Sequence, residues 1–230
     1  MKIEHYLLLA SIQTGLSAVV AFLSFFKFRS RDVIVRLMGF VFLTGALANT
    51  AAYLLVKSGT FRGYSNLAPS VYLMISLCLF SRIYFILLGK KNAPVFQAVS
   101  IAFVCFSSFN IFFLQGTQIN SYSRIFYAAI VIVYCLLYFY VLMKDLPSLY
   151  LHTLPMFWFN SALLIFHAGA FFLFSFQDYL VNVLKNDMVT YGSFQTMLSI
   201  VEHIIFIVGL GYDFRLLKSG GAEGLVQTRR

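Results

Sequence analysis

The stretch SFQTMLSIVEHIIFIVGLGYDFRLLK, residues 193–218, has the pattern of a membrane-spanning helix with a basic exit. Its apolar run extends from Met197 to Tyr212 and is interrupted by few polar residues. Two of these, Glu202 and His203, lie near the middle of the run. A carboxylate at the centre of a bilayer costs a few kcal/mol and is rarely accidental. We therefore expect Glu202 and His203 to belong to a functional polar core.

The polar residues of this stretch share one side of the helix. Gln195, Ser199, Glu202 and Phe206 are spaced at i, i+4, i+7 and i+11, and Gly209 continues the same face with a small residue. We expect this face to point inward, toward other helices.

The stretch ends in Gly209-Leu210-Gly211-Tyr212, followed by Arg215 and Lys218, as expected at a cytoplasmic surface. This ending resembles the seventh helices of bacterial seven-transmembrane receptor regions that feed histidine kinases and other signalling domains. The resemblance implies that Gly209, Gly211 and Arg215 belong to a signal-output segment. It also implies a cytosolic histidine kinase or regulator as the partner.

Composition places the whole chain in the membrane class. Hydrophobic residues make up 60%, aromatic residues 18% and charged residues 11% of the 230 residues, and mean hydropathy is +0.84. This is too little polar surface for a soluble globule. The net charge of +9 is then explained by lipid headgroups and by cytoplasmic loops, and nucleic acid is not expected as a partner.

Seven apolar segments follow one another along the chain, which predicts an all-α bundle of seven transmembrane helices. They cover about residues 6–26, 33–56, 67–89, 94–114, 122–143, 150–176 and the stretch described above. We expect residues 1–218 to form a single transmembrane domain and residues 219–230 a short flexible cytosolic tail. Residues 179–189 in the longest loop fit either a short interfacial helix or a cap on the bundle.

The distribution of cations indicates an N-out, C-in orientation. The segment ends assigned to the cytosol carry Lys27, Arg29, Arg31, Arg36, Lys90, Lys91, Lys144, Arg215, Lys218, Arg229 and Arg230, whereas the outer ones carry Lys2, Lys57, Arg62, Arg124 and Lys185. Cytoplasmic loops are enriched in lysine and arginine, so we expect a multi-pass protein with this orientation. The resemblance to bacterial receptor regions implies that the membrane is a bacterial inner membrane.

One cation, Arg82, lies inside a predicted span. Counted along the helices, it falls within about one turn of the depth of Glu202. Pairing would offset the cost of both charges, which predicts an ion pair between the third and seventh helices. In the alternative, Arg82 reaches toward the inner headgroups, while Glu202 is protonated or bonded to His203.

Other polar residues lie at membrane depth in the remaining segments. Asn160 and His167 are seven residues apart on one face of the sixth segment, and Asn49 lies in the second. We include all three among the ligand or polar-core candidates, although a lone membrane histidine is more often a structural hydrogen-bonding group. A stripe of Tyr127, Tyr134 and Tyr138 in the fifth segment fits packing better than a binding cage.

Several chemistries are not indicated. Residues 193–214 contain no lysine for a retinal Schiff base, and the chain has no HExxH motif, no glycine-rich phosphate loop and no rhomboid-type serine motif. Cys78, Cys105 and Cys135 lie singly in apolar segments, which predicts buried free thiols. We therefore expect no cofactor, no metal and no designated catalytic residue.

A second resemblance covers more of the chain. The phrases DLPSLYLHTLPMFWFNSALLIF, residues 145–166, and SYSRIFY, residues 121–127, are similar to those of a group of small, stand-alone bacterial seven-helix membrane proteins. That resemblance implies an architecture and little chemistry. The chain departs from kinase-linked receptors because it has no cytosolic coiled coil or kinase, so a separate partner would be required.

Together these features favour a sensor or receptor-like subunit that relays a signal through the last helix to a cytosolic partner. The alternative is a carrier or a membrane-embedded enzyme that acts on a small amphiphilic or lipid-like molecule. We regard an enzyme as the weaker hypothesis, and a homo-oligomer stays open.

Overall fold

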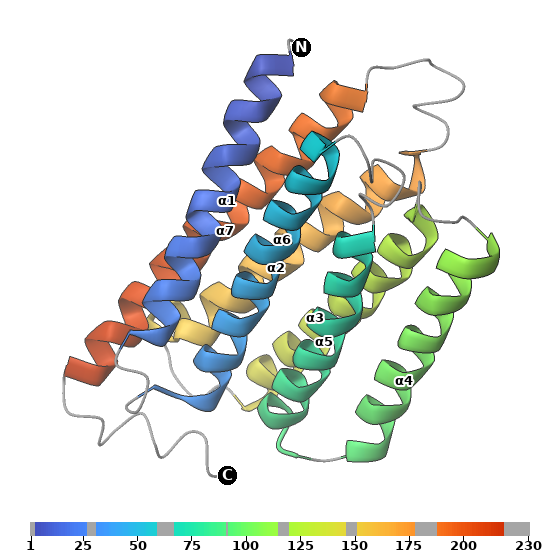
Figure 1. Ribbon diagram of the computed structural model, residues 1–230. Coiled ribbons are helices and arrows are strands. Elements are labelled where there is room, and N and C mark those ends of the chain that lie inside the picture. Colours follow the sequence, from blue (N-terminus) through green and yellow to red (C-terminus); the bar gives the residue numbers. More distant parts are fainter. Residues whose placement is uncertain are drawn as a thin grey trace.

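The computed structural model describes residues 3–26, 31–58, 67–90, 92–114, 120–145, 151–177 and 188–218, and these residues form helices and short turns without a strand. The long helices are α1 (Ile3–Phe25), α2 (Val33–Ser58), α3 (Leu67–Leu87), α4 (Ala93–Phe109), α5 (Ser121–Asp145), α6 (Pro155–Ser175) and α7 (Met188–Lys218) (Figure 1). Together with the π-helical turn η3 that extends α4, they give seven spans that are long and apolar enough to cross a membrane. The all-α prediction and the number of segments are confirmed.

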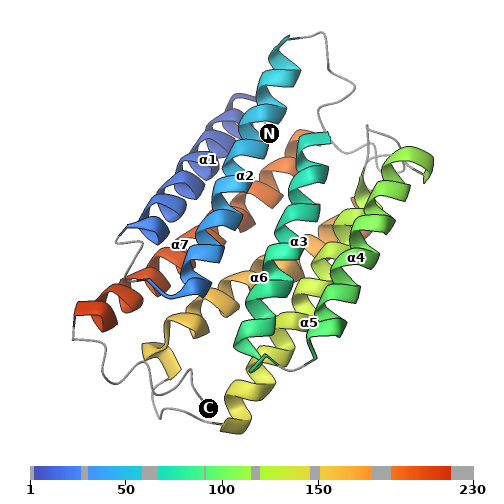
Figure 2. The same ribbon diagram turned by 60° about the horizontal axis from the view of Figure 1, so that its bottom comes forward.

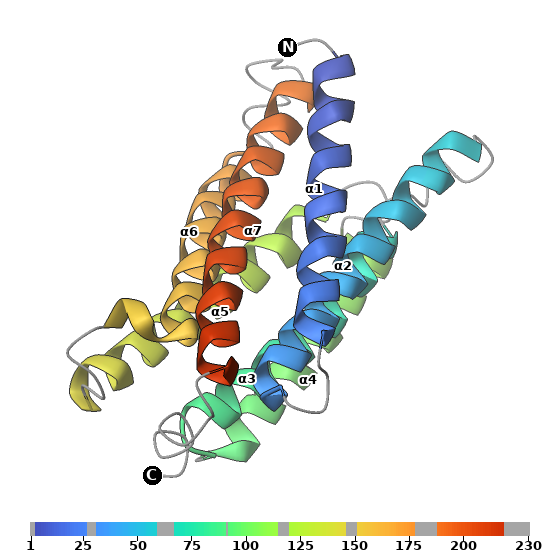
Figure 3. The same ribbon diagram turned by 90° about the vertical axis from the view of Figure 1, so that its left-hand side faces the viewer.

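The helices form a bundle in which α4 is peripheral. α1 packs against α2 and α7, α2 against α3, α3 against α5, α5 against α6, and α6 against α7. α4 packs mainly on α3 and lies at the edge of the bundle, away from α1 and α7 (Figures 1 and 2). α7 therefore lies between α1 and α6, as the side view also shows (Figure 3).

The outer surface of the bundle is apolar, as expected for contact with lipid chains. Large hydrophobic side chains are exposed on every helix, among them Leu8, Phe22, Leu47, Phe112, Leu137, Phe172 and Val201. Patches of this extent are rare on soluble monomers. The structure thus supports a multi-pass membrane protein.

A buried amide network fixes the end of the bundle where α3, α5 and α7 begin. α4 passes into a π-helical turn, η3 (Asn110–Leu114), at a buried asparagine. The Asn110 side-chain amide donates to Asn120 Oδ1 at 2.7 Å and to Ser123 Oγ at 3.0 Å. Asn120 in turn donates to Ser70 Oγ at 2.6 Å. Side-chain bonds therefore join α3, η3 and the start of α5.

Three details differ from the sequence-based expectations. α7 begins at Met188, one turn before the predicted Ser193, so it has 31 residues. A short 3-10 turn, η4 (Leu151–Thr153), precedes α6. Cys78 and Cys105 are free thiols but are exposed on the bundle surface, so only Cys135 is buried as predicted. The predicted interfacial segment falls mostly, and the tail entirely, outside the described residues.

Candidate functional site

The predicted polar face of α7 does point into the bundle. Ser199, Glu202 and Phe206 are buried, and Gly209 is buried as well. The Gln13 amide of α1 donates to Ser199 Oγ at 3.0 Å, which joins α1 to this face. The helical spacing read from the sequence is therefore confirmed.

The predicted ion pair between Arg82 and Glu202 is wrong. Arg82 is exposed on the outside of α3, and its guanidinium lies 5.4 Å from the ring centre of Phe85 on the same helix. Glu202 is 6% exposed, and within the described part of the chain no cation pairs with it. Equal depth along two helices does not bring two side chains together when their faces point in different directions.

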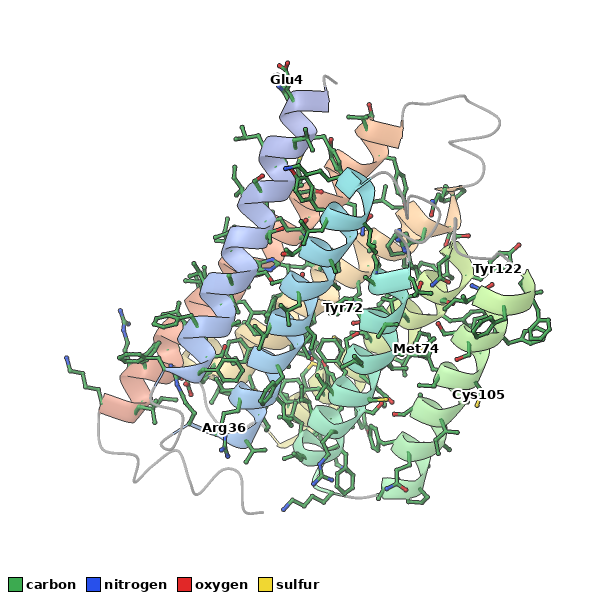
Figure 4. All side chains as sticks on the ribbon, viewed as in Figure 1. Glu4, Arg36, Tyr72, Met74, Cys105 and Tyr122 are labelled. Atoms are coloured by element: carbon green, nitrogen blue, oxygen red, sulfur yellow. The ribbon has the colours of Figure 1, made fainter. Side chains whose placement is uncertain are left out.

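The groups that interact electrostatically with Glu202 are instead on α3 and α5. Its carboxyl is within electrostatic range of Tyr72, Tyr127 and Cys135. The hydroxyls of Tyr72 and Tyr127 are within hydrogen-bonding reach of each other and of Ser76. Figure 4 places Tyr72 between α2 and α3. These groups form what we term the acidic hydroxyl cluster: Glu202, Tyr72, Tyr127 and Ser76.

The two buried histidines adopt the same local geometry. His203 Nδ1 lies 2.5 Å from the Ser199 carbonyl oxygen, and His167 Nδ1 lies 2.8 Å from that of Leu163. Each ring therefore donates from Nδ1 to the carbonyl one turn earlier. Nε2 is the acceptor in that tautomer, and in both rings it is buried without a hydrogen-bond partner in the described structure.

Aromatic rings enclose these histidines. The ring of His203 lies 5.0 Å from that of Phe42 on α2. His167 lies 5.4 Å from Tyr127 and 6.3 Å from Phe80, measured between ring centres. Tyr127 thus connects His167 with the acidic hydroxyl cluster. The tyrosine stripe of α5 contributes polar contacts as well as packing.

Asn160 is the centre of a second buried network. Tyr84 donates from its hydroxyl to Asn160 Oδ1 at 2.6 Å, and the Asn160 amide donates to the Cys135 carbonyl at 3.1 Å. Ser81 and Tyr134 share a hydrogen bond of 3.0 Å nearby on the same two helices, α3 and α5. Asn160 therefore binds α3, α5 and α6 together. By contrast, Asn49 is exposed and does not join the polar core.

An apolar groove opens beside the acidic hydroxyl cluster. It has a volume of about 690 Å³ and lies between the last part of α2 and the first part of α3. It is lined by Thr44, Leu47, Ala48, Ala51, Leu55, Leu67, Ala68, Val71, Tyr72 and Ile75. Of these, Tyr72 belongs to both the groove and the cluster, and its ring packs closely against Gly45 of α2.

An ion pair fixes the opposite end of the bundle. The guanidinium of Arg31, between α1 and α2, pairs with the Asp213 carboxylate of α7. It also donates to the carbonyls of Leu23 and Phe26 at 3.2 Å, and it lies 3.8 Å from the ring centre of Phe214. Arg31 is 4% exposed. Arg31, which the sequence assigns to the cytosolic end of a segment, is a buried link between α1 and α7.

The predicted output residues have different surroundings. A Cβ atom at Gly209 would lie 2.6 Å from the Phe159 ring of α6, whereas one at Gly211 would meet nothing within 4 Å. Arg215 is exposed, with its guanidinium 5.6 Å from the Tyr212 ring centre. Tyr212 stacks on Trp158 of α6. Gly209 therefore sets the spacing between α6 and α7, and Gly211 does not.

The described residues contain no group of three or more His, Cys, Asp or Glu side chains that could hold a metal ion. The described residues offer a buried carboxyl, hydroxyls and two buried imidazole acceptors, and separately an apolar groove between α2 and α3. Comparisons with family models, curated proteins and solved structures find no match to this chain.

Sequence reasoning missed Tyr72, Ser76, Tyr84 and the pairing of Arg31 with Asp213. The tyrosines and Ser76 lie in an almost wholly apolar helix, α3, in which a hydroxyl is an ordinary feature. Asp213 did carry a signal, because it is the acidic residue in the last turns of a helix that ends in cations. Nothing in the sequence around Asp213 indicates that its partner is Arg31, which lies 182 positions earlier.

Proposed function

We propose that this chain is a receptor-like membrane subunit that relays a signal through α7 to a separate cytosolic partner. In this proposal the protein spans a bacterial inner membrane with its N-terminus outside and its C-terminus inside. The cation distribution supports the orientation. The resemblance of the end of α7 to kinase-linked receptor helices supports a histidine kinase or a regulator as the partner.

The observation that carries the proposal is the pairing of Arg31 with Asp213. A buried ion pair is costly to break and has discrete made and broken states. Such an element can hold α7 against α1 in one state and release it in another. Because Asp213 is one to two turns from the last described residue of α7, release would change the surface that this end presents.

α7 provides a continuous connection between the polar core and this ion pair. Glu202 and Asp213 are on the same uninterrupted helix, and eleven residues of helix span about 16 Å. Between them, Gly209 packs on the ring of Phe159, which itself stacks on Phe206 at 4.5 Å. Interfaces packed this closely shift between alternative arrangements more readily than they deform gradually. A change beside Glu202 would then reach Asp213 as a movement of the helix.

Site-specific photocrosslinking from native membranes tests this proposal. A photoreactive residue at exposed Leu216 of α7 should capture one cytosolic protein, whereas the same residue at exposed Lys144 of α5 should not. Asp213→Asn should change the yield at Leu216, and Arg82→Gln, which removes an exposed charge on α3 away from this segment, should serve as the control for altered charge. If the photoreactive residue at Leu216 captures no cytosolic protein, either with the Arg31–Asp213 pair intact or with Asp213→Asn, the relay is contradicted.

A carrier or an enzyme for a small amphiphile is the second candidate, and the groove between α2 and α3 favours it. A carrier would move its ligand without any partner at the end of α7. Uptake of an amphiphile into vesicles that contain only this protein, abolished by filling the groove, would therefore decide for the carrier.

A further inference from the structure

We infer that the outward face of α3 binds an anionic phospholipid of the surrounding bilayer. The phosphate of this lipid lies at Arg82 and Lys90, and one of its acyl chains lies beside Cys78 and Ile75. This site requires that the bundle lie in a membrane, but it is separate from the relay. Loss of the lipid is therefore expected to leave the capture of a cytosolic protein by α7 unchanged.

One continuous stripe of α3 faces outward from the bundle. Its members are spaced by four, three and four residues, as on one face of a helix, and all of them are exposed: Val71, Ile75, Cys78 and Arg82. Arg82 is the only charged residue of α3. Its side chain therefore lies on a surface that the chains of a bilayer cover, where a charge without a partner is costly.

The described residues do not supply a countercharge for Arg82. Its guanidinium lies 5.4 Å from the ring centre of Phe85, and no described carboxylate pairs with it. α3 lies between α2 and α4 (Figure 1), and these three helices contain no Asp or Glu. Asp32, just before α2, accepts a hydrogen bond from the Ile34 amide at 3.1 Å and so caps that helix. An anion from the bilayer can supply the missing charge.

A phosphodiester is the anion that suits this position. Arg82 is about 12 Å from Lys90 along the helix direction, and a long arginine side chain at this depth extends toward the headgroups. Lys90 is exposed there and adds a second positive charge. A guanidinium binds two phosphate oxygens at once. An anionic headgroup such as phosphatidylglycerol therefore fits better than a zwitterionic one, whose own cation would meet two others.

The apolar surface next to Arg82 favours a lipid as the source of the phosphate over free phosphate in water. Cys78 and Ile75 follow one and two turns along the same stripe, and Ile75 lines the groove between α2 and α3. Ile75 is about 10 Å from Arg82 along the helix. Half of the hydrocarbon core of a bilayer is about 15 Å thick. A lipid chain that starts near Arg82 therefore reaches the groove.

Quenching of a fluorophore on Cys78 by spin-labelled lipids tests this inference. Bimane is attached to exposed Cys78 in a Cys105→Ser background, where Cys135 is buried and stays unlabelled. The protein is placed in phosphatidylcholine nanodiscs with a small share of lipid that carries a nitroxide on its acyl chain. Spin-labelled phosphatidylglycerol should quench at a share at least about fivefold lower than spin-labelled phosphatidylcholine, because one cation near a membrane surface contributes about 1 kcal/mol toward an anionic lipid.

The same label on Cys105, in a Cys78→Ser background, is the matched control. Cys105 is exposed on the outer side of α4 (Figure 4). It lies about as far from the turn between α3 and α4 as Cys78 does, but α4 carries no charged residue. The two spin-labelled lipids should therefore quench this label equally.

Arg82→Gln should remove the preference for phosphatidylglycerol at Cys78, whereas Arg215→Gln, the same change at an exposed arginine of α7, should preserve it. Inorganic phosphate should not compete with the spin-labelled lipid. Equal quenching by the two lipids at Cys78, an equal preference at Cys105, or a preference that survives Arg82→Gln would overturn the inference. Competition by inorganic phosphate would also overturn it, because the two cations would then bind an anion from water.

Discussion

The guanidinium of Arg31 pairs with the carboxylate of Asp213 and so joins the connection after α1 to the last turns of α7. The same guanidinium satisfies carbonyls at the end of α1, which otherwise lack intrahelical partners. One side chain thus closes α1 and positions the end of α7. The first predictions concern this pair.

Asp213→Ala should lower the free energy of unfolding by about 2–3 kcal/mol, because it leaves a buried guanidinium without its partner. The double variant Arg31→Met with Asp213→Ala should be less destabilised than the sum of the two single variants by at least about 1 kcal/mol. Chemical unfolding monitored by Trp158 fluorescence measures these values. Arg215→Ala, at an exposed position on the same helix, is the control, and simple additivity would show that the pair contributes no coupling.

Gly209→Ala should destabilise the bundle by about 1–3 kcal/mol, because the new methyl group would overlap the Phe159 ring in a packed interface. Gly211→Ala should be neutral or stabilising by up to about 1 kcal/mol, because it replaces a helical glycine in open space. The melting temperatures of Gly209→Ala and Gly211→Ala in the same detergent compare the stabilities of the two variants. Equal effects of the two changes would contradict the close packing of α7 on α6.

Tyr84→Phe should cost about 1–3 kcal/mol, because it leaves the buried carbonyl of the Asn160 amide without its hydroxyl donor. Tyr140→Phe changes an exposed tyrosine of α5 and should have little effect. A double-mutant cycle with Asn160→Leu should give a coupling energy above about 0.5 kcal/mol. A coupling near zero would mean that the network does not hold α3 against α6.

Arg82→Gln should change stability by less than about 0.5 kcal/mol, as expected for a surface position away from special contacts. Its effect should also add to that of Glu202→Gln, because the two side chains do not meet. Unfolding of the two single variants and the double variant supplies the comparison. A large coupling energy between the two substitutions would indicate that Arg82 and Glu202 form an ion pair, which would contradict the structure.

The positions of the helices could be predicted from the sequence to a large extent, because runs of apolar residues bounded by cations and prolines locate membrane spans. The direction in which a helix faces could be predicted for α7, where Ser199 and Glu202 mark one side, and in part for α6, where Asn160 and His167 share a buried face. α3 is apolar all round, so its pattern does not distinguish the buried face of Leu77, Phe80 and Tyr84 from the outer face of Arg82. The predicted pair of Arg82 and Glu202 failed for this reason.

The sequence likewise identifies some residues of the candidate site and not others. Glu202, His203, Asn160 and His167 could be identified because polar groups at membrane depth are conspicuous, and all four are buried. Asn49 has the same chemistry but lies on the outside of α2. Arg31 and Asp213 meet through packing of α7 on α1, which no local pattern encodes.

The central claim is that the pair of Arg31 and Asp213 is a two-state element at the output end of α7. Pulsed electron paramagnetic resonance tests it directly, with spin labels at Leu216 of α7 and Met143 of α5 in a background where Cys78 and Cys105 are serine. We predict that Asp213→Asn shifts the distance distribution to a second, separate peak, while Arg215→Ala leaves it unchanged. A single unchanged peak after Asp213→Asn would contradict the account.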